Sequence, residues 1–398
     1  MFETLKPMPA DPILSLTVEA RADNNPKKVD LGSGVYKTDA GNTPVLDCVR
    51  EAQFRRVNEE TSKVYVSPKG DEGFTTAITN LLFGADHPAL KDNRVRAAQV
   101  PGGCGALRVG AEFVMRAAPD AAIYVSNPTW ANHVPLLGES GMKIKEYPYY
   151  DYASHTVDFD AMMEGLKAAG KGDLVLLHGC CHNPCGADLS HDQWRSVTDL
   201  AVKNGFTPFI DIAYQGFGDG VEEDAFGIRH MAAHVPEMVI AQSCSKNFGL
   251  YRERTGTTLI LGRNAAEADV ALSQMLSAIR AIYSMPPAHG AELVKIILED
   301  EALKARWIEE VAEMRERIAG VRTDLVAGIA AAGVNEDFSF IERERGMFSF
   351  LGITPQQVET LKKDYSIYMV NSSRISVCGL NPSNMDYFCD SLAKVLRQ

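Results

Sequence analysis

Five short segments of this chain carry polar side chains of types that could support covalent chemistry. One of them holds Lys246, which follows an apolar run and has Ser243, Ser245 and Arg254 close by in sequence. A lysine removed from water titrates at a lower pH and can form a Schiff base with a carbonyl compound. Most single lysines are solvated surface residues, so the significance of Lys246 depends on what lies around it.

A carboxylate and an amide follow two further apolar runs. Asp211 stands near the end of Pro208–Ile212, and Asn183 begins an Asn-Pro-Cys-Gly turn after Leu174–His178. An unpaired carboxylate at the tip of an apolar strand is costly, which predicts a cation or a hydrogen-bond donor beside Asp211. The simpler alternative is that Asp211 only caps a helix.

The glycine-rich segment Pro101–Gly105 precedes a helical pattern, Ala106–Ala118. Such a turn presents free backbone N–H groups and the positive end of the helix dipole, and both favour phosphate. It is not a Walker A motif, because no Gly-Lys-Ser/Thr follows. It is also a poor dinucleotide motif, since Arg108 replaces the third glycine, which weighs against a nicotinamide-dependent dehydrogenase. A plain tight turn is the alternative.

Two other segments contain an aromatic ring and a group of possible metal ligands. Trp130 follows Ala122–Ser126, where its ring could face an aromatic ligand or simply pack in the core. The stretch His178–Cys185 is rich in cysteine and histidine. No second Cys/His pair stands at zinc-site spacing, and adjacent cysteines point to opposite sides of an extended chain. We therefore expect no metal, and a non-enzymatic metal-binding protein is the alternative from another functional class.

These segments require a sheet to bring them together. Short apolar runs alternate with helical patterns, which predicts an α/β fold with a mostly parallel, doubly wound sheet. Ligands of such sheets bind at the carboxyl ends of the strands, where the five segments lie. The predicted strands are Arg96–Val100, Ala122–Ser126, Lys143–Tyr147, Leu174–His178, Pro208–Ile212, Met238–Gln242 and Thr257–Leu261.

The pattern changes after about Pro286, where two long helical stretches, 286–298 and 300–332, precede short elements. The second stretch could link two domains. We expect strands at 338–341, 347–350 and 374–377, and helices at 354–364 and 381–396, which together suggest a small α+β domain. The expected division is an N-terminal arm with part of the small domain (1–45), a large domain (46–311) and a small domain (312–398).

Composition excludes several classes of protein. The chain has 398 residues and a formal net charge of −12, which argues against non-specific nucleic-acid binding. The N-terminal residues lack the pattern of a signal peptide, and no apolar run is long enough to span a membrane. The eight cysteines are scattered, which favours free thiols in the cytoplasm.

Together the segments match the needs of one cofactor. Pyridoxal 5′-phosphate requires a lysine for its aldehyde and a carboxylate for its ring nitrogen. It also needs a phosphate site, a flat side chain over the ring and donors to its phenolic oxygen. This coincidence is far more specific than any single segment, and it predicts an enzyme that uses this cofactor.

The chain resembles the class I pyridoxal-phosphate-dependent aminotransferases, within the aspartate and aromatic-amino-acid subgroup. The resemblance implies fold type I of the pyridoxal-phosphate transferases, in which a large domain carries a seven-stranded sheet, and a homodimer with shared active sites. The motifs that carry it run nearly end to end: DPILSL, LGSGVYK, GGCGALR, NPTWANH, HGCCHNPCG, DIAYQGF, SKNFGLYRERTG, IRAIYSMPP, RGMFSFLG and SSRISVCGLN.

The resemblance implies a role for each matching residue. Lys246 would bind the aldehyde and then move the substrate proton, while Asp211 would hold the ring nitrogen with His133 behind it. Tyr214 would act with Lys246 and Asp211 in catalysis and, like Asn183, would donate to the phenolic oxygen. The other implied cofactor contacts are Trp130 and Ala213 on the ring faces, Gly103, Cys104, Ser243, Ser245 and Arg254 at the phosphate, and Tyr65 from the neighbouring subunit.

Two arginines would bind the substrate in this resemblance. Arg374 would hold the α-carboxylate, and Arg280 of the neighbouring subunit would meet a distal carboxylate. Gly34, Trp130 and Asn183 would also lie against the substrate. The implied reaction is ping-pong transamination between an aromatic amino acid or aspartate and 2-oxoglutarate. A strict aspartate aminotransferase, or a β-lyase or decarboxylase on the same fold, is the alternative.

Four positions depart from the family pattern. Cys104 replaces the usual Thr or Ser of the phosphate loop, Cys185 replaces the Thr of Asn-Pro-Thr-Gly, and Cys244 and Ala131 also differ. None of them removes a residue with an implied catalytic role, so we expect effects on cofactor affinity or substrate range only.

Overall fold

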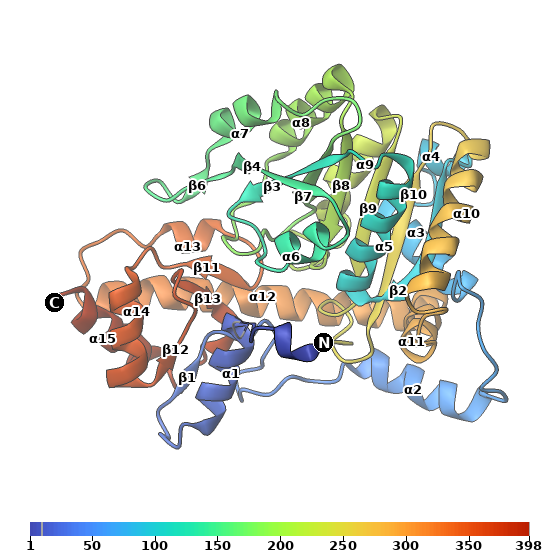
Figure 1. Ribbon diagram of the computed structural model, residues 1–398. Helices are drawn as coiled ribbons and strands as arrows, with labels where there is room; N and C mark the ends of the chain where they lie inside the picture. The colour runs from blue at the N-terminus through green and yellow to red at the C-terminus, as the bar shows by residue number, and fades with distance from the viewer. Residues whose placement is uncertain (9–10, 398) are drawn as a thin grey trace. The chain divides into compact units, whose positions relative to one another are not determined.

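The computed structural model describes residues 1–8 and 11–397, which divide into two compact units. The larger unit consists of Pro44–Arg317 and Glu344–Gly346. The smaller unit consists of the described parts of Met1–Thr43, Ile318–Arg343 and Met347–Gln398. Each unit is built from segments that are far apart in the sequence, so neither could be assigned from one continuous stretch (Figure 1).

A seven-stranded sheet forms the centre of the larger unit, with the order β2-β10-β9-β8-β7-β3-β4 (Figure 1). The pairs β3–β4, β3–β7, β7–β8 and β8–β9 are parallel, whereas β10 is antiparallel to both of its neighbours. The predicted mostly parallel sheet and its seven strands are therefore confirmed. Their bounds are β2 (Val95–Pro101), β3 (Ala122–Asn127), β4 (Lys143–Pro148), β7 (Leu174–His178), β8 (Thr207–Ile212), β9 (Met238–Ser243) and β10 (Thr255–Leu261).

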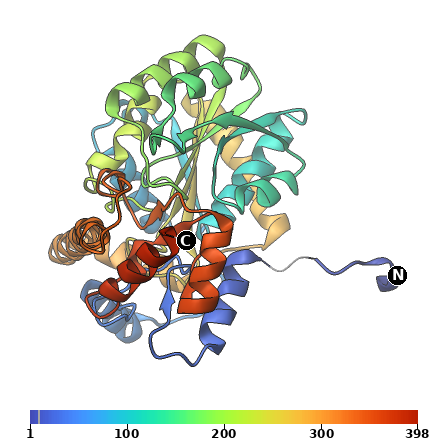
Figure 2. The same ribbon diagram turned by 90° about the vertical axis from the view of Figure 1, so that its left-hand side faces the viewer.

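Helices cover both faces of this sheet, and its strands β9 and β10 are buried along their whole length (Figure 2). On one face α5 (Gly102–Ala117) packs on the central strands and against α10 (Ala265–Ile282). The opposite face carries α3 (Glu72–Phe83), α8 (His191–Asn204) and α9 (Phe226–His234). Further elements of this unit are α2 (Asp47–Glu59), α4 (Pro88–Lys91), α6 (His133–Gly138), α7 (Phe159–Leu166), α11 (His289–Glu299), β5 (Tyr150–Asp151) and β6 (Thr156–Val157).

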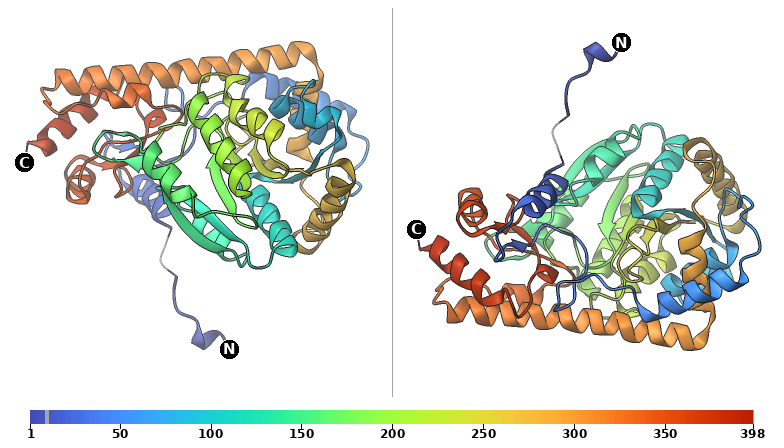
Figure 3. Two further views of the ribbon diagram at one scale, coloured as in Figure 1. Left: turned by 90° about the horizontal axis from the view of Figure 1, so that it is seen from above. Right: turned by 90° about the horizontal axis from the view of Figure 1, so that it is seen from below.

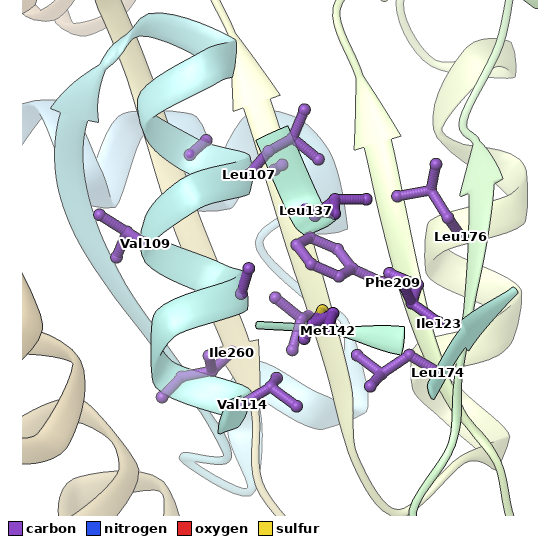
Figure 4. Close-up of a cluster of buried hydrophobic side chains, with 14 of the residues drawn as sticks. Leu107, Val109, Val114, Ile123, Leu137, Met142, Leu174, Leu176, Phe209 and Ile260 are labelled. Atoms are coloured by element: carbon purple, nitrogen blue, oxygen red, sulfur yellow. The ribbon is translucent and has the colours of Figure 1, made fainter. Parts of the chain in front are cut away.

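The contact between α5 and the sheet depends on one residue without a side chain. Phe209 on β8 is fully buried, and Figure 4 shows it among the aliphatic residues of α5 and the neighbouring strands. A Cβ atom on Gly110 of α5 would lie 2.7 Å from the Phe209 ring. Gly110 therefore lets the helix approach the sheet closely, and this sets the position of the helix start.

Two local predictions about helix ends can be compared with the structure. Ser190 and Gln193 form the predicted capping box at the start of α8, which ends at Gly205 in the left-handed conformation. By contrast, α5 begins at Gly102 rather than at Ala106. The glycine-rich segment is thus the first turn of the helix itself and not a loop before it.

The smaller unit combines helices with two short strand pairings. The long helix α12 (Glu301–Ala331) is continuous, and its residues belong to the larger unit up to Arg317 and to the smaller unit from Ile318 (Figure 3). Strand β11 pairs with β13 in antiparallel fashion, and β1 pairs with β12 in parallel fashion. The bounds are α1 (Pro12–Ala22), α13 (Phe340–Arg343), α14 (Pro355–Tyr365), α15 (Met385–Leu396), β1 (Val29–Asp30), β11 (Phe348–Phe350), β12 (Ile367–Tyr368) and β13 (Arg374–Ser376).

One predicted strand of this unit is wrong. Residues 338–341 were expected to be extended, but a turn at Phe338 leads into the short helix α13. Phe338, Phe340 and Ile341 are all buried, and a short apolar run is equally compatible with a buried strand and a buried helical turn. The predicted strands at 347–350 and 374–377 and the helices at 354–364 and 381–396 are confirmed within a few residues. Among the described residues, no helix is long and apolar enough to cross a membrane.

Removing the Phe209 ring should destabilise the larger unit strongly. We expect Phe209→Ala to lower the free energy of unfolding by about 3–5 kcal/mol, because a cavity would remain between α5 and the sheet. Guanidinium denaturation of the cofactor-free protein measures this. The control is Val202→Ala on α8, where the side chain is 52% exposed, so a change of about 0.5 kcal/mol or less is expected. Equal losses in the two variants would contradict the packing argument.

Candidate active site

The first turn of α5 forms the anion-binding part of the site. Pro101 precedes the helix and provides no side-chain cap, so the first backbone N–H groups are not used by a capping residue. Gly102 has a φ of +69°, and a Cβ atom there would lie 2.7 Å from the Arg254 guanidinium. A Cβ atom on Gly103 would lie 3.4 Å from Cβ of Ser243. Arginine and serine thus meet the positive end of a helix, an arrangement that binds phosphate.

Two serines, one at the end of β9 and one just after it, complete this region. Ser243 Oγ lies 3.0 Å from Ser245 Oγ, and the Ser245 N–H donates to Ser243 Oγ at 3.2 Å. Both serines are buried, while Cys104 in the first turn of α5 is partly buried and lines a cavity of about 400 Å³. The residues that were predicted to bind a phosphate therefore lie together, although they come from three separate segments.

Asp211, in β8, is kept ionised by a histidine. His133 Nε2 lies 2.9 Å from Asp211 Oδ2, and Thr129 Oγ1 lies 2.7 Å from the other ring nitrogen of His133. Since a carboxylate only accepts, His133 donates from Nε2 to Asp211. Burial alone would raise the pKa of Asp211, but the bond from His133 and the nearby Lys246 outweigh it and leave this pKa below its usual value.

Two further histidines extend behind Asp211. The rings of His133 and His178 are 5.2 Å apart, and those of His178 and His182 are 4.0 Å apart. Burial lowers the pKa of His178 to about 3 and that of His182 well below its usual value, so both are neutral at pH 7. Neutral rings exclude water without neutralising the carboxylate, which leaves the charge of Asp211 available to a ligand.

Lys246 lies in the same buried region. Its Nζ is 5.0 Å from the centre of the Tyr214 ring. Burial lowers the pKa of Lys246, while the charge of Asp211 partly opposes this effect. Trp307 on α12 holds the loop that contains Lys246. It donates from Nε1 to the Asn247 carbonyl at 2.8 Å and stacks on Phe248. The backbone that carries Lys246 is therefore held in place, and its ammonium group loses a proton more easily than that of an ordinary lysine.

The two expected ring neighbours and the amide lie at the same edge of the sheet. Trp130 follows β3 and meets His133 edge to face, with ring centres 5.2 Å apart. Asn183 follows β7 and is buried, and its Oδ1 has no hydrogen-bond partner among the described residues. Ala213 is partly buried next to Tyr214, at the end of β8.

Two of the predicted substrate residues belong to the smaller unit. Arg374 is only 5% exposed, donates from Nη2 to the Gly32 carbonyl at 2.9 Å, and lies with its guanidinium carbon 4.5 Å from the centre of the Phe348 ring. A Cβ atom on Gly34 would come within 3.3 Å of Phe348 Cζ. The guanidinium is therefore held in one orientation by an aromatic face and a carbonyl.

Two predicted residues are not brought into the site by this chain. Arg280 lies exposed at the end of α10, where it contacts Ser284, and Tyr65 is 86% exposed. Both were expected to act in the site of a neighbouring subunit, so a surface position in one chain is what that expectation requires.

The geometry can now be compared with known proteins. The chain matches the family described as "Aminotransferase class I and II" over residues 26–392. This chain belongs to that family. It is 46% identical over 396 residues to an aspartate aminotransferase of Escherichia coli, with all of both chains covered. It is 45% identical over 394 residues to an aromatic-amino-acid aminotransferase of Pseudomonas aeruginosa, with 99% of this chain and 98% of the relative covered.

A solved structure agrees with these sequence matches. An aromatic-amino-acid aminotransferase of Burkholderia pseudomallei, covalently bound to pyridoxal phosphate, has a TM-score of 0.97 and 41% identity. The alignment covers 100% of this chain and 99% of that chain. The predicted aminotransferase family and fold class are confirmed.

Two cysteines of the cysteine-rich segment lie close to a carboxylate of a different loop. The sulfur atoms of Cys180 and Cys181 and a carboxylate oxygen of Asp224 lie within 4.8 Å of one another. The Asp224 oxygens already accept the N–H groups of Gly216, Gly218 and Asp219. We interpret Asp224 as a brace for the loop after Tyr214.

Sequence reasoning missed two residues that hold the site of this aminotransferase in place. The sequence placed Trp307 only within the helical stretch 300–332, yet its indole N–H donates to the Asn247 carbonyl and holds the Lys246 loop. Asp188 was not among the candidate residues, although it is partly buried and accepts two hydrogen bonds from the segment before Asn183. A buried tryptophan needs an acceptor for its indole N–H, and this requirement is the one sequence signal that could have indicated Trp307.

Removing the charge of Asp211 should lower the pKa of Lys246 further. In Asp211→Asn the ammonium form of Lys246 loses its favourable neighbour, so its proton leaves at a lower pH than in the wild type. NMR titration of the lysine side chains in cofactor-free protein measures this, with the signal assigned by its loss in Lys246→Met. Asp192→Asn is the control, because that side chain is 91% exposed. An unchanged or raised pKa in Asp211→Asn would contradict the electrostatic coupling.

Proposed function

We propose that this aminotransferase exchanges amino groups between aromatic amino acids or aspartate and 2-oxoglutarate, with pyridoxal 5′-phosphate as its cofactor. The observation that carries the proposal is one buried region that combines a lysine of lowered pKa, an ionised carboxylate and an anion-binding helix start. The family requires these three groups together, and here they come from the loop after β9, from β8 and from α5.

The residues present fit the cofactor. The first turn of α5 with Arg254 and the two serines would hold its phosphate. Asp211 would hold the protonated ring nitrogen, which its lowered pKa favours. Asn183 and Tyr214 would donate to the phenolic oxygen. When bound, pyridoxal phosphate supplies an electron sink for the bonds at the substrate Cα.

Lys246 would act first as the covalent anchor and then as the proton carrier. With an amino-acid substrate bound, Nζ would be free to accept the proton from the substrate Cα. Its lowered pKa means that the neutral, accepting form costs less to populate than in an ordinary lysine. Nζ would then return the proton at C4′ of the cofactor.

Substrate recognition would rely on two arginines in different environments. Arg374 would form a bidentate pair with the α-carboxylate, for which Phe348 and the Gly32 carbonyl already orient its guanidinium. In a homodimer with shared sites, Arg280 of the partner subunit would bind the distal carboxylate and Tyr65 of the partner subunit would reach the phosphate. The exposure of both residues in the single chain supports this arrangement.

The domain roles follow from these assignments. We propose that residues 46–311 form the cofactor domain, that 312–398 form the small domain with Arg374, and that 1–45 form the arm with part of the small domain. We also propose a cytoplasmic location, because all eight cysteines are free thiols.

The absorption spectrum of the purified protein tests the function directly. We expect a yellow cofactor band that is lost on adding aspartate or phenylalanine and restored by 2-oxoglutarate. The more effective amino acid would show whether the enzyme is a strict aspartate aminotransferase. A protein that stays colourless with added pyridoxal phosphate would overturn the proposal, and free ammonia or carbon dioxide among the products would indicate a β-lyase or a decarboxylase.

Arg280 should matter for dicarboxylic substrates only. We expect Arg280→Ala to lower kcat/KM for aspartate roughly ten- to hundredfold, because a charge-assisted contact is lost. The value for phenylalanine should change much less. Steady-state kinetics with both amino acids measures the difference, and Arg263→Ala, whose side chain is 54% exposed, serves as the control. Equal losses for the two substrates would contradict the assignment of Arg280.

A further inference from the structure

Asp188 is a partly buried carboxylate that the reaction described above does not use. It lies in the loop between β7 and α8, shortly after Asn183. One of its oxygens accepts the Cys181 N–H at 2.6 Å, and the other accepts the His182 N–H at 2.7 Å. Both bonds end on the two residues that directly precede Asn183.

The carboxylate of Asp188 is costly to keep in this place. Burial raises its pKa to about 7, against the opposing effect of the two N–H bonds, and the charges of Asp224 and Asp219 raise it further. Its hydrogen-bond partners are the N–H groups of Cys181 and His182. Hydrogen bonds to an ionised carboxylate are short and strong, so the charge orders these two peptide groups. The loop is therefore built around Asp188.

The side chain of His182 is fixed as well as its backbone. The ring nitrogens lie 3.1 Å from Ser126 Oγ and 3.1 Å from Cys185 Sγ, and the ring stacks on Tyr149 with centres 4.1 Å apart. The His182 carbonyl accepts the Gly186 N–H at 2.7 Å. The residue directly before Asn183 is thus held both by its backbone and by its ring.

The same loop is held from a second direction within the larger unit. The Arg345 N–H donates to the Gly186 carbonyl at 2.8 Å. A Cβ atom on Gly346 would lie 2.4 Å from Cβ of Cys181, so this glycine allows the segment to press against the loop. Cys181 itself has a φ of +52°, a conformation that non-glycine residues rarely adopt without support.

We propose that Asp188 is a positioning residue for the cofactor, acting through the amides of Cys181 and His182 to aim the Asn183 side chain at the phenolic oxygen. The inference rests on the proposed function, since it requires that Asn183 donates to that oxygen. Asp188 itself touches neither cofactor nor substrate.

The expected effect has a definite sign. If the phenolic oxygen loses a donor, its negative charge is less stabilised, and the nitrogen that joins Lys246 to the cofactor holds its proton more tightly. The visible band of the holoenzyme then titrates at a higher pH. In Asp188→Asn the side chain has one accepting oxygen, while its NH₂ group faces the second amide, so one of the two bonds is lost.

The experiment compares the wild type with Asp188→Asn, Asn183→Ala and the double variant. We expect Asp188→Asn to raise the pH midpoint of the visible band, by less than Asn183→Ala does. It should also weaken cofactor binding roughly two- to tenfold, as one lost hydrogen bond would. The double variant should have the midpoint of Asn183→Ala, because Asp188 acts through that residue. Asp192→Asn is the matched control and should leave the midpoint unchanged.

Three results would overturn the inference. If Asn183→Ala raises the midpoint and Asp188→Asn does not, Asp188 only stabilises the fold. If Asp188→Asn raises the midpoint further in the Asn183→Ala background, it acts by another route. If Asn183→Ala leaves the midpoint unchanged, the assignment of Asn183 in the proposed function fails, and the inference fails with it. Should Asp188→Asn not fold, Asp188→Ser, which keeps one acceptor in a smaller volume, is read in the same way.

Discussion

An ionised carboxylate held away from water is the constraint on which the rest of this site depends. Burial of the Asp211 carboxylate is unfavourable unless another group compensates its charge, and His133 does this with one strong hydrogen bond. The neutral rings of His178 and His182 then keep water out without consuming the charge. Lys246 is coupled to the same carboxylate, which limits how far burial lowers its pKa. Cofactor chemistry at neutral pH needs both groups in these states.

The sheet explains how such distant segments meet. The strands β3, β7, β8 and β9 are parallel, so Trp130, Asn183, Asp211 and the Lys246 loop all follow strand ends at one edge. Strand β10 runs the other way, and its first residue Thr255 pairs with Pro101 at the end of β2. The residue before β10 is Arg254, which thereby reaches the start of α5. A single antiparallel strand brings the arginine to the phosphate region.

Rigidity around the site comes from residues that do not take part in the reaction. Trp307 braces the Lys246 loop from α12, Gly110 brings α5 close to the sheet, and Asp188 orders the segment before Asn183. In each case a residue outside the reaction fixes a backbone position, which a hydrogen bond of good geometry requires. The smaller unit follows the same rule, because Phe348 and the Gly32 carbonyl hold Arg374.

The sequence by itself determined the seven strands, the capping box at Ser190 and the set of chemical groups at Lys246, Asp211, Asn183 and Arg254, because apolar runs, helix caps and residue types are local properties. Only the tertiary structure decided that α5 begins at Gly102, that 340–343 is helical and that β10 is antiparallel. It also revealed the hydrogen bonds that Trp307 and Asp188 form with the loops of the site. These features depend on contacts between residues distant in the chain, for which a short apolar run or an isolated aspartate carries no local signal.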